Sequence, residues 1–316
     1  MTSKKDLSVI IVNWNTCDFL AQCLESVPGG QLSETGLGQH VEVGTRNLDI
    51  EVIVVDNASS DGSAEMVRRR FPQVKLIENS RNIGFAMANN QAIAYSRGRY
   101  VLLLNSDTVV HSGALQRMVA FMEDHSRAGA VGPRLLNEDG TLQPSVHPMM
   151  TPAREFWRLI FLEKLWPLAR YQQEQWDTET PRLVDVIKGA CLMVRRRALE
   201  QTGLLDDRYF MYTEEVDLCY RLARDGWNLC YVPAAVVTHF GEASSRQMAE
   251  DMYIQLYRSK LQFFRKFGGA GRARRFKVLV SLAYAPRAMV ATTSGLISEP
   301  WRTRGKTYRR LLRELD

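Results

Sequence analysis

The sequence predicts an α/β protein in which helices cover both faces of a mostly parallel β-sheet. Short, uniformly apolar runs alternate with segments whose apolar residues recur at helical spacing. Each run is too short for a helix and too uniform for a half-exposed strand, so it predicts a strand buried on both faces. Polar residues follow each run at once. We therefore expect these polar residues at the carboxyl ends of parallel strands, where ligands bind in open α/β sheets.

Strands and helices are expected to alternate from residue 8 to residue 123. A strand at 8–12 leads into a helix at 17–27, and a polar, Gly-rich stretch at 28–47 is expected to form a surface loop. After residue 133 the alternation lapses, and residues 137–140 are expected to form a hairpin turn. The further expected strands are 50–55, 74–77, 100–104, 188–194, 228–232 and 235–237. The further expected helices are one ending at 66–71, then 84–96, 113–123, an amphipathic helix at 152–171, one opened by residues 195–197 and one opened by Thr213.

Asp107 follows the apolar strand at 100–104, where a carboxylate could hold a divalent cation against a phosphate. A simpler interpretation is that Asn105, Ser106 and Asp107 turn the chain and cap the helix that begins near Ser112. The glycine-rich phosphate loops G-x-G-x-x-G and G-x-x-x-x-G-K-[ST] are absent after the expected strands. A bound nucleotide would therefore be held by carboxylates and a metal.

A second polar stretch, residues 209–221, places three carboxylates at the start of an expected helix. Thr213 precedes Glu214, Glu215 and Asp217, and the helix dipole favours negative charge at a helix N-terminus. The dipole alone is enough to explain these acids structurally. A catalytic role for one of them is the alternative.

The net charge of +6 is unevenly distributed along the chain. Residues 258–316 carry 15 Lys and Arg against three Asp and Glu, so this tail has a charge of +12 and the remainder a charge of −6. A nucleic-acid-binding protein would use such a tail for phosphate contacts. The acidic remainder fits that function poorly, so no nucleic-acid partner is expected.

The basic tail is expected to be helical. Residues 253–267 predict a helix that ends at the glycine pair 268–269, and the apolar stretches 276–285 and 288–297 are separated at Pro286. Short apolar segments between clusters of Arg and Lys predict helices that lie in a membrane interface without crossing it. A solvated basic helical hairpin packed on the rest of the protein is the alternative.

The cysteines and the N-terminus predict a cytoplasmic protein. The five cysteines contain no C-x-x-C pair and no zinc-site spacing with His, so they are expected to be reduced core residues. The first residues lead straight into a strand without an apolar signal region. No apolar run reaches the ~18 residues that a membrane span requires. We therefore expect a cytoplasmic protein held peripherally at the inner face of the membrane.

Six stretches together resemble the family 2 glycosyltransferases with the GT-A fold, most closely the bacterial rhamnosyltransferase-like members. These stretches are residues 12–15 (VNWN), 54–63 (VVDNASSDGS), 79–86 (NSRNIGFA), 103–108 (LLNSDT), 189–190 (GA) and 211–218 (MYTEEVDL). They occur in the order of the family, over about residues 7–245. The resemblance implies a GT-A catalytic domain at 1–245, with a nucleotide-binding half at 1–110 and an acceptor and catalytic half at 111–245. A basic helical extension at 246–316 would follow it.

The resemblance also implies a set of residues around the nucleotide. Asp56 is expected to meet the base, with the turn from Asn13 to Asn15 and the turn at Arg81 and Asn82 beside it. The full expected set is Asn13, Asn15, Asp56, Arg81, Asn82 and Asn105.

The metal and the catalytic base are implied in the same way. Asp107 corresponds to the last position of the D-x-D motif, which coordinates Mg²⁺ or Mn²⁺ on the donor diphosphate, while Asn105 stands where the first Asp often lies. His239 corresponds to a histidine that is a further metal ligand in some members, although a lone His at a strand end is usually an ordinary residue. Glu215 falls at the position of the catalytic base, where Asp is commoner, and Asp217 is the second choice.

The chemistry agrees with these roles. Negative charge develops on the leaving phosphate and can be neutralised by the metal, and one carboxylate can take the proton of the acceptor hydroxyl. A direct displacement of this kind inverts the anomeric centre. We therefore expect an inverting glycosyltransferase that moves a sugar, from dTDP-rhamnose, to a cell-surface glycan or a lipid-linked acceptor. The same residues would serve a UDP-sugar, and Asn105 and Glu215 also permit a catalytically inactive scaffold that binds sugar nucleotides.

Overall fold

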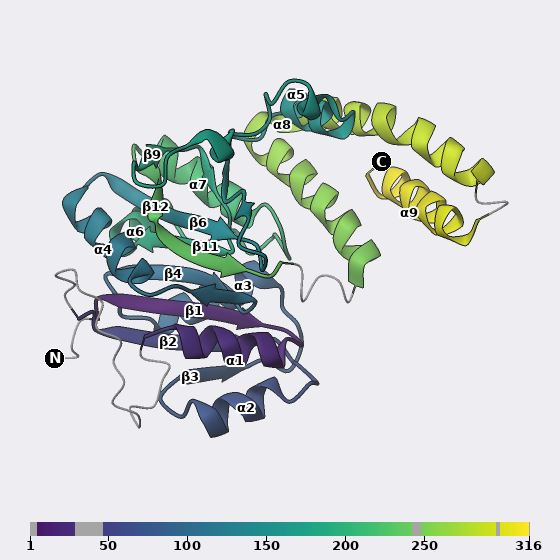
Figure 1. The fold of residues 1–316 in the computed structure, drawn as a ribbon. Helices are drawn as coiled ribbons and strands as arrows, with labels where there is room; N and C mark the ends of the chain where they lie inside the picture. The colour runs from purple at the N-terminus through teal and green to yellow at the C-terminus, as the bar shows by residue number, and fades with distance from the viewer. Residues whose placement is uncertain (1–4, 29–46, 242–247, 295–297, 316) are drawn as a thin grey trace.

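The computed structural model describes residues 5–28, 47–241, 248–294 and 298–315, and a ten-stranded mixed sheet runs through it (Figure 1). The strands are β1 (Leu7–Asn13), β2 (Ile50–Asp56), β3 (Lys75–Glu78), β4 (Tyr100–Asn105), β5 (Thr108–Val110), β6 (Ala128–Leu136), β7 (Leu142–Gln143), β8 (Val146–His147), β9 (Arg182–Leu183), β10 (Val186–Ile187), β11 (Cys191–Arg195) and β12 (Asn228–His239). The helices are α1 (Cys17–Ser26), α2 (Ser63–Arg70), α3 (Phe85–Tyr95), α4 (Ala114–Asp124), α5 (Pro152–Leu159), α6 (Arg196–Thr202), α7 (Glu214–Arg224), α8 (Ala249–Ser294) and α9 (Glu299–Leu315). Almost all of the loop expected at 28–47, and the domain boundary expected at 245–246, lie outside the described residues.

The predicted α/β class with a mostly parallel sheet is confirmed. The main strand order is β3, β2, β1, β4, β11, β6, β12, β5, with β8 and β10 in a separate small pair. β1 runs parallel to β2 and β4, and β12 runs parallel to β6. β11 lies antiparallel between β4 and β6, which joins the parallel N-terminal strands to the second half of the sheet.

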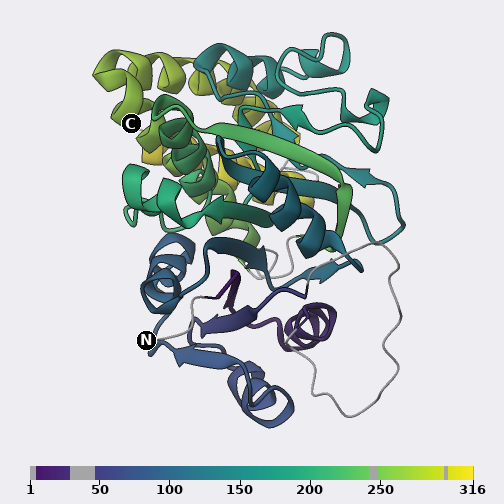
Figure 2. The same cartoon turned by 90° about the vertical axis from the view of Figure 1, so that its left-hand side faces the viewer.

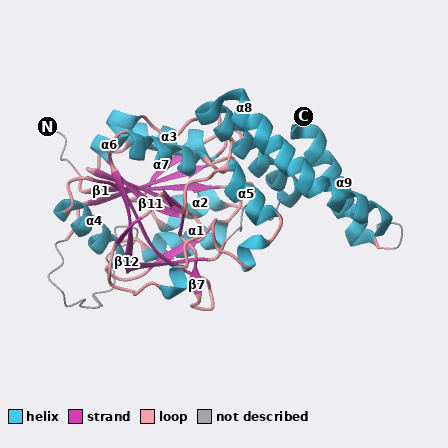
Figure 3. Cartoon of the chain, turned by 90° about the horizontal axis from the view of Figure 1, so that it is seen from above, coloured by secondary structure: helices cyan, strands magenta, loops and turns pink. Residues whose placement is uncertain are grey.

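Side chains of the central strands point alternately into two apolar cores, one on each face of the sheet. Ile10 and Leu103 belong to the core under α3, α6 and α7, whereas Ile11 and Leu104 belong to the core under α1, α2 and α4. Figures 2 and 3 show the helices on both sides of the sheet. Because both faces of these strands are covered, their sequences are uniformly apolar, as expected.

Three expected elements differ in the structure. The helix expected at 152–171 ends at Leu159, because Phe161 adopts a left-handed conformation (φ 62°) before a short 3₁₀ turn at Leu162–Lys164. The two strands expected at 228–232 and 235–237 are one strand, β12, with an irregularity between Val232 and Val236. The break expected at Pro286 is absent, since α8 continues through this residue.

The C-terminal helices pack against the sheet domain through the first arm of α8. As predicted, the helix is interrupted at the glycine pair, where Gly269 has φ 66° and divides α8 into two arms. Figure 1 shows the two arms at an angle, with α9 alongside the second. In the first arm, Lys260 Nζ forms a buried ion pair with Glu155 Oε2 of α5 at 2.5 Å. Burial alone would raise the pKa of Glu155, but the charges of Lys260 and Arg158 lower it below its usual range.

Candidate active site

The carboxyl ends of β1 and β2 bring Asn13 and Asp56 together. The two residues are paired in the sheet register, and Asn13 Nδ2 donates to Asp56 Oδ1 at 3.1 Å. The other oxygen of Asp56 accepts the Ser59 N–H at 2.9 Å. Asp56 is buried, and each carboxylate oxygen keeps capacity for a further hydrogen bond.

Two turns beside this pair are held by amide side chains. Asn15 has φ 52°, and its Oδ1 accepts the Ser60 N–H at 2.7 Å. Asn82 Oδ1 accepts the Gly84 N–H at 2.9 Å and the Asn57 Nδ2–H at 3.1 Å. Both asparagines therefore fix loop geometry.

A small cavity of about 220 Å³ opens next to these turns. Its lining is mostly apolar, with two amide side chains among Val12, Trp14, Asn57, Asn82, Gly84, Phe85, Phe210, Met211, Met248 and Met252. Gly84 is needed here because it has φ 87° and an added Cβ would lie 2.5 Å from the Phe210 carbonyl oxygen. Arg81 is exposed on the neighbouring turn and is not among the described residues that line this cavity.

Asp107 and His239 converge at the ends of β4 and β12. His239 Nε2 lies 3.3 Å from Asp107 Oδ1 and 3.3 Å from Asn105 Nδ2. Gln143 holds the other nitrogen of the imidazole. Gln143 Nε2 donates to the carbonyl of His239 and to Asn137 Oδ1, so Gln143 Oε1 lies 2.7 Å from His239 Nδ1. We therefore assign the proton to Nδ1, so the Nε2 lone pair accepts from Asn105 Nδ2, with Asp107 Oδ1 at the same distance.

The donor set suits a divalent cation that is completed by substrate oxygens. Carboxylate and amide oxygens are ligands for Mg²⁺ or Mn²⁺, and an imidazole nitrogen suits Mn²⁺ better than Mg²⁺. Within the described ranges, no group of three or more His, Cys, Asp and Glu side chains forms a metal site. The protein can thus supply two strong ligands, Asp107 and His239, with Asn105 beside them.

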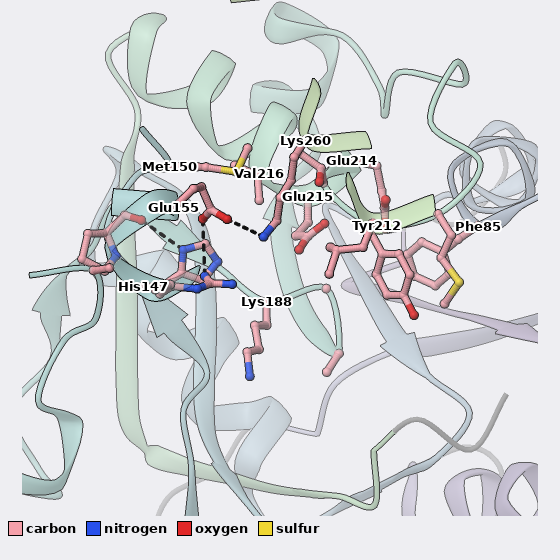
Figure 4. A pocket seen from close by; sticks show the side chains of 18 of the residues that line it. Phe85, His147, Met150, Glu155, Lys188, Tyr212, Glu214, Glu215, Val216 and Lys260 are labelled. Atoms are coloured by element: carbon pink, nitrogen blue, oxygen red, sulfur yellow. Dashed lines mark hydrogen bonds and ion pairs between the residues drawn. The ribbon is translucent and has the colours of Figure 1, made fainter. Parts of the chain in front are cut away.

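A larger cavity of about 340 Å³ lies beside this cluster and contains Glu215 (Figure 4). Asn105 and His239 belong to its lining, and Phe85 and Met211 line both this cavity and the smaller one. Residues of α5 and α8 also line it, including the Glu155–Lys260 ion pair shown in Figure 4. Phe85 and Met211 therefore lie between the two cavities, and Asn105 and His239 belong to the lining of the larger one.

The turn before α7 contains two consecutive residues with left-handed backbones, Tyr212 (φ 67°) and Thr213 (φ 73°). This turn places the first glutamates of α7 in the cavity lining. Non-glycine residues rarely adopt this conformation, and each such residue costs about 1–3 kcal/mol. Glu214 and Glu215 both line the cavity, and each has one buried oxygen without a hydrogen-bond partner in the described structure. The strained turn places both carboxylates where a ligand could reach them.

The two glutamates differ in electrostatic environment. Burial, and secondly the charge of Glu215, raise the pKa of Glu214 well above its usual value, so of the two glutamates this one holds its proton more readily. Burial also raises the pKa of Glu215, but backbone N–H groups at the start of α7 and the Lys188 ammonium oppose the shift. Glu215 is therefore the member of the pair that carries the charge.

Asp217, the second expected catalytic residue, is not brought into the cavity. It is fully buried, with Oδ1 accepting from Arg221 Nε at 2.6 Å. Its Oδ2 accepts from Lys266 Nζ of α8 at 2.6 Å and from the Tyr209 hydroxyl at 3.2 Å. Asp217 thus links α7 to the first arm of α8, and we assign it a structural role.

The model of the family described as "Glycosyl transferase family 2" matches residues 8–203 of this chain. The chain belongs to glycosyl transferase family 2. Among curated relatives of this transferase is the N-acetylglucosaminyl-diphospho-decaprenol L-rhamnosyltransferase of Mycobacterium tuberculosis, which is 34% identical over 205 residues. The alignment covers 60% of this chain and 66% of the relative. The low-salt glycan biosynthesis hexosyltransferase Agl10 of Haloferax volcanii is 26% identical over 241 residues, with 74% of this chain and 68% of the relative covered.

Solved structures support the GT-A fold of this glycosyltransferase. The mannosyltransferase PcManGT of Pyrobaculum calidifontis, in complex with GDP-Man and Mn²⁺, superposes with a TM-score of 0.53 at 19% identity. That comparison covers 98% of this chain and 86% of PcManGT. GalNAc-T7 with UDP, GalNAc and Mn²⁺ superposes with a TM-score of 0.51 at 17% identity, over 76% of this chain and 44% of GalNAc-T7. These likenesses concern the fold.

Sequence reasoning missed several residues that shape the transferase site. Gln143 orients His239, yet it lies in a two-residue strand, β7, that has no apolar pattern. Lys188 lies in the cavity wall near Glu215. The sequence feature that could have identified it is its position directly before the Gly189-Ala190 stretch. Glu155 and Lys260 are far apart in the sequence and meet only because α8 returns to α5.

Proposed function

We propose that this protein is an inverting, metal-dependent transferase that moves a sugar from a nucleotide donor to a lipid-linked or cell-surface glycan acceptor. The observation that carries the proposal is that one cavity contains both Glu215 and His239, with Asp107 Oδ1 3.3 Å from His239 Nε2, and that it shares Phe85 and Met211 with the smaller cavity. The smaller cavity suits a nucleoside, since flat apolar walls and two amides can hold a base. Asp56 would accept a hydrogen bond from the base through one of its oxygens.

Asp107 and the Nε2 atom of His239 would hold Mg²⁺ or Mn²⁺, and Asn105 would lie beside the donor diphosphate. When bound, the cation would neutralise the charge that develops on the leaving phosphate. Gln143 keeps His239 in the tautomer that can act as a ligand. Two protein ligands are enough here because the diphosphate oxygens supply others.

Glu215 would act as the general base that takes the proton of the acceptor hydroxyl. The hydroxyl oxygen then attacks the anomeric carbon from the side opposite to the leaving diphosphate, and the configuration inverts. Lys188 keeps the pKa of Glu215 from rising further, which preserves the carboxylate form near neutral pH. Glu214 stays protonated beside it and adds no second negative charge.

The name of the mycobacterial relative supports rhamnose as the sugar and a diphosphate-linked lipid as the acceptor. We propose dTDP-rhamnose as the donor. A UDP-sugar is the alternative donor, since the same carboxylates and amides would hold a uridine nucleotide. An inactive scaffold that binds sugar nucleotides is a second alternative, because Asn105 and Glu215 replace the commoner aspartates.

We further propose that the second arm of α8 holds the protein at a membrane surface. Val278, Leu282 and Met289 are exposed at spacings that place them on one face of the helix, with Arg274 and Arg275 next to them. An exposed apolar stripe beside basic residues is typical of a helix that lies in an anionic lipid interface. None of the described helices is both long enough and apolar enough to span a bilayer.

Replacing Asp107 by Asn should abolish the effect of metal on donor binding, because the main carboxylate ligand is lost. Calorimetric titration with dTDP-rhamnose and with UDP-sugars, each with and without Mn²⁺, measures this. Asp18→Asn, on the exposed face of α1, is the matched control and should bind as the unmodified protein does. Failure of the unmodified protein to bind any of these donors, or equal stimulation by Mn²⁺ in the Asp107 variant, would contradict the proposal.

Replacing Glu215 by Gln should lower kcat by about 100-fold or more, since general base catalysis contributes at least that factor. Donor affinity should be unchanged. Glu200→Gln, an exposed glutamate on α6, is the control. Near-normal turnover of the Glu215 variant would remove the base assignment, and donor binding without turnover in the unmodified protein would favour the scaffold.

The pH profile of kcat/KM should show an acid limb above pH 4.5, the ordinary value for Glu, because burial raises the pKa of Glu215. Activity requires the carboxylate, so it falls as the pH decreases through this raised pKa. Lys188→Met should move the limb to still higher pH, because a nearby positive charge is lost. Arg117→Gln, on the distant helix α4, should leave the limb in place. A limb at or below pH 4.5, or a downward shift in the Lys188 variant, would show that Glu215 is not the group observed.

The double variant Leu282→Glu, Met289→Glu should bind anionic vesicles at least about tenfold more weakly, because burial of each apolar side chain contributes roughly 1.5–3 kcal/mol. Flotation with vesicles of phosphatidylglycerol and phosphatidylcholine measures the bound fraction. Met87→Glu, an exposed apolar residue on α3, is the control. Equal binding of the double variant, or recovery of the unmodified protein wholly in the soluble fraction at low salt, would refute the membrane role.

A further inference from the structure

A third cavity, the outer cavity, shares part of its wall with the cavity that contains Glu215. It has a volume of about 460 Å³, and its lining comprises Pro144, Val146, His147, Arg158, Phe161, Glu163, Ala169, Arg170 and Lys188. Four of these residues, His147, Arg158, Ala169 and Lys188, also line the cavity of Glu215. A ligand that extends from Glu215 into the outer cavity would therefore pass residues of this shared wall, among them Lys188 and Arg158. Figure 4 shows Lys188 in the cavity of Glu215.

Lys188 carries a positive charge into this passage without a paired carboxylate. Its side chain is partly buried, and within the described chain its ammonium group forms no ion pair or hydrogen bond. Burial lowers the pKa of Lys188, and the charge of Glu215 partly opposes this. A partly buried cation without a direct partner is unfavourable until an anion binds it.

Arg158 adds a second positive charge at the same place. Its Nη1 atom lies 3.5 Å from Glu155 Oε1, but Glu155 is already paired with Lys260 at 2.5 Å. His147 is neutral, because burial lowers its pKa to about 4. The remaining charged residues of the outer cavity are Glu163 and Arg170, and Arg170 pairs loosely with the exposed Glu174.

Apolar residues lie around the part of the outer cavity that is away from the charged side chains. Phe161 and Ala169 belong to its lining, and the segment between them exposes Leu165 and Trp166 by 74% and 65%. Exposed apolar side chains beside an anion site suit a ligand whose charged group continues into a hydrocarbon chain. A free inorganic anion would make no use of them.

We propose that Lys188 and Arg158 form a subsite for the phosphate or diphosphate group that joins the acceptor sugar to its lipid. The sugar would occupy the large cavity with a hydroxyl at Glu215, and the lipid would leave past Phe161 toward the exposed segment. Arg158 can bind two phosphate oxygens at once, while Lys188 acts as a point charge. The subsite deepens the proposed function and rests on it for the identity of the acceptor.

Titration with farnesyl diphosphate in the presence of EDTA tests the subsite without donor, metal or turnover. Lys188→Met and Arg158→Gln should each weaken binding by at least about tenfold, since each removes a charge-assisted contact to the anion. Lys188→Arg should retain binding, and Arg117→Gln is the control for the loss of a distant surface charge. Loss of Lys188 also favours protonation of Glu215, which removes a negative charge near the ligand. That effect alone would strengthen anion binding. The expected weakening therefore reports the loss of the Lys188 contact.

Farnesol and inorganic pyrophosphate separate the contributions of chain and charge. Weak binding of both, compared with farnesyl diphosphate, supports a lipid-linked anion as the ligand. Pyrophosphate that binds as tightly as farnesyl diphosphate would overturn the lipid-linked assignment in favour of a free anion. Equal binding of farnesyl diphosphate to all variants, or farnesol as tight as the diphosphate, would overturn the subsite itself. Donor titration of the same proteins tests the proposed function separately, because the nucleotide cavity contains neither Lys188 nor Arg158.

Discussion

The parallel pairing of β1 with β2 and β4 is the constraint on which the active site depends. The register places Asn13 opposite Asp56 and Val12 opposite Asn105, so the three strands end at one edge. Because both faces of these strands are buried under helices, polar groups can begin only where the strands end. Asn13, Asp56 and Asn105 therefore lie next to each other at this edge, and a hydrogen bond of 2.9 Å between the Thr16 and Ser106 hydroxyls joins the turns that follow β1 and β4.

The second half of the site depends on the return of the chain through α8. Its first arm contributes Lys260 to the cavity wall, and Ser259 Oγ donates to the carbonyl of Met211 just before the strained turn. Lys266 holds Asp217 of α7 from the same arm. Removing one partner of a buried ion pair leaves an uncompensated charge, which strongly destabilises the fold. The position of Glu215 therefore depends on α8, a segment outside the matched family region.

The charges around the start of α7 treat the two neighbouring glutamates differently. Adjacent glutamates at the start of α7 cannot both ionise easily in a buried environment, and the more buried Glu214 takes the proton. The helix N-terminus and Lys188 favour the anionic form of Glu215. In our proposal Lys188 also binds the acceptor phosphate, which would couple acceptor binding to the protonation state of Glu215.

The sequence by itself determined the α/β class, most strand positions, the family, and the places of Asp107, Glu215 and His239. It could do so because buried parallel strands have uniform apolar runs and the polar motifs follow them directly. Tertiary structure alone decided that Asp217 is an ion-pair partner, that Gln143 orients His239, and that Lys188, Arg158 and the Glu155–Lys260 pair form one wall. These relations join residues far apart in the chain, and no local periodicity encodes which distant charges meet when helices pack.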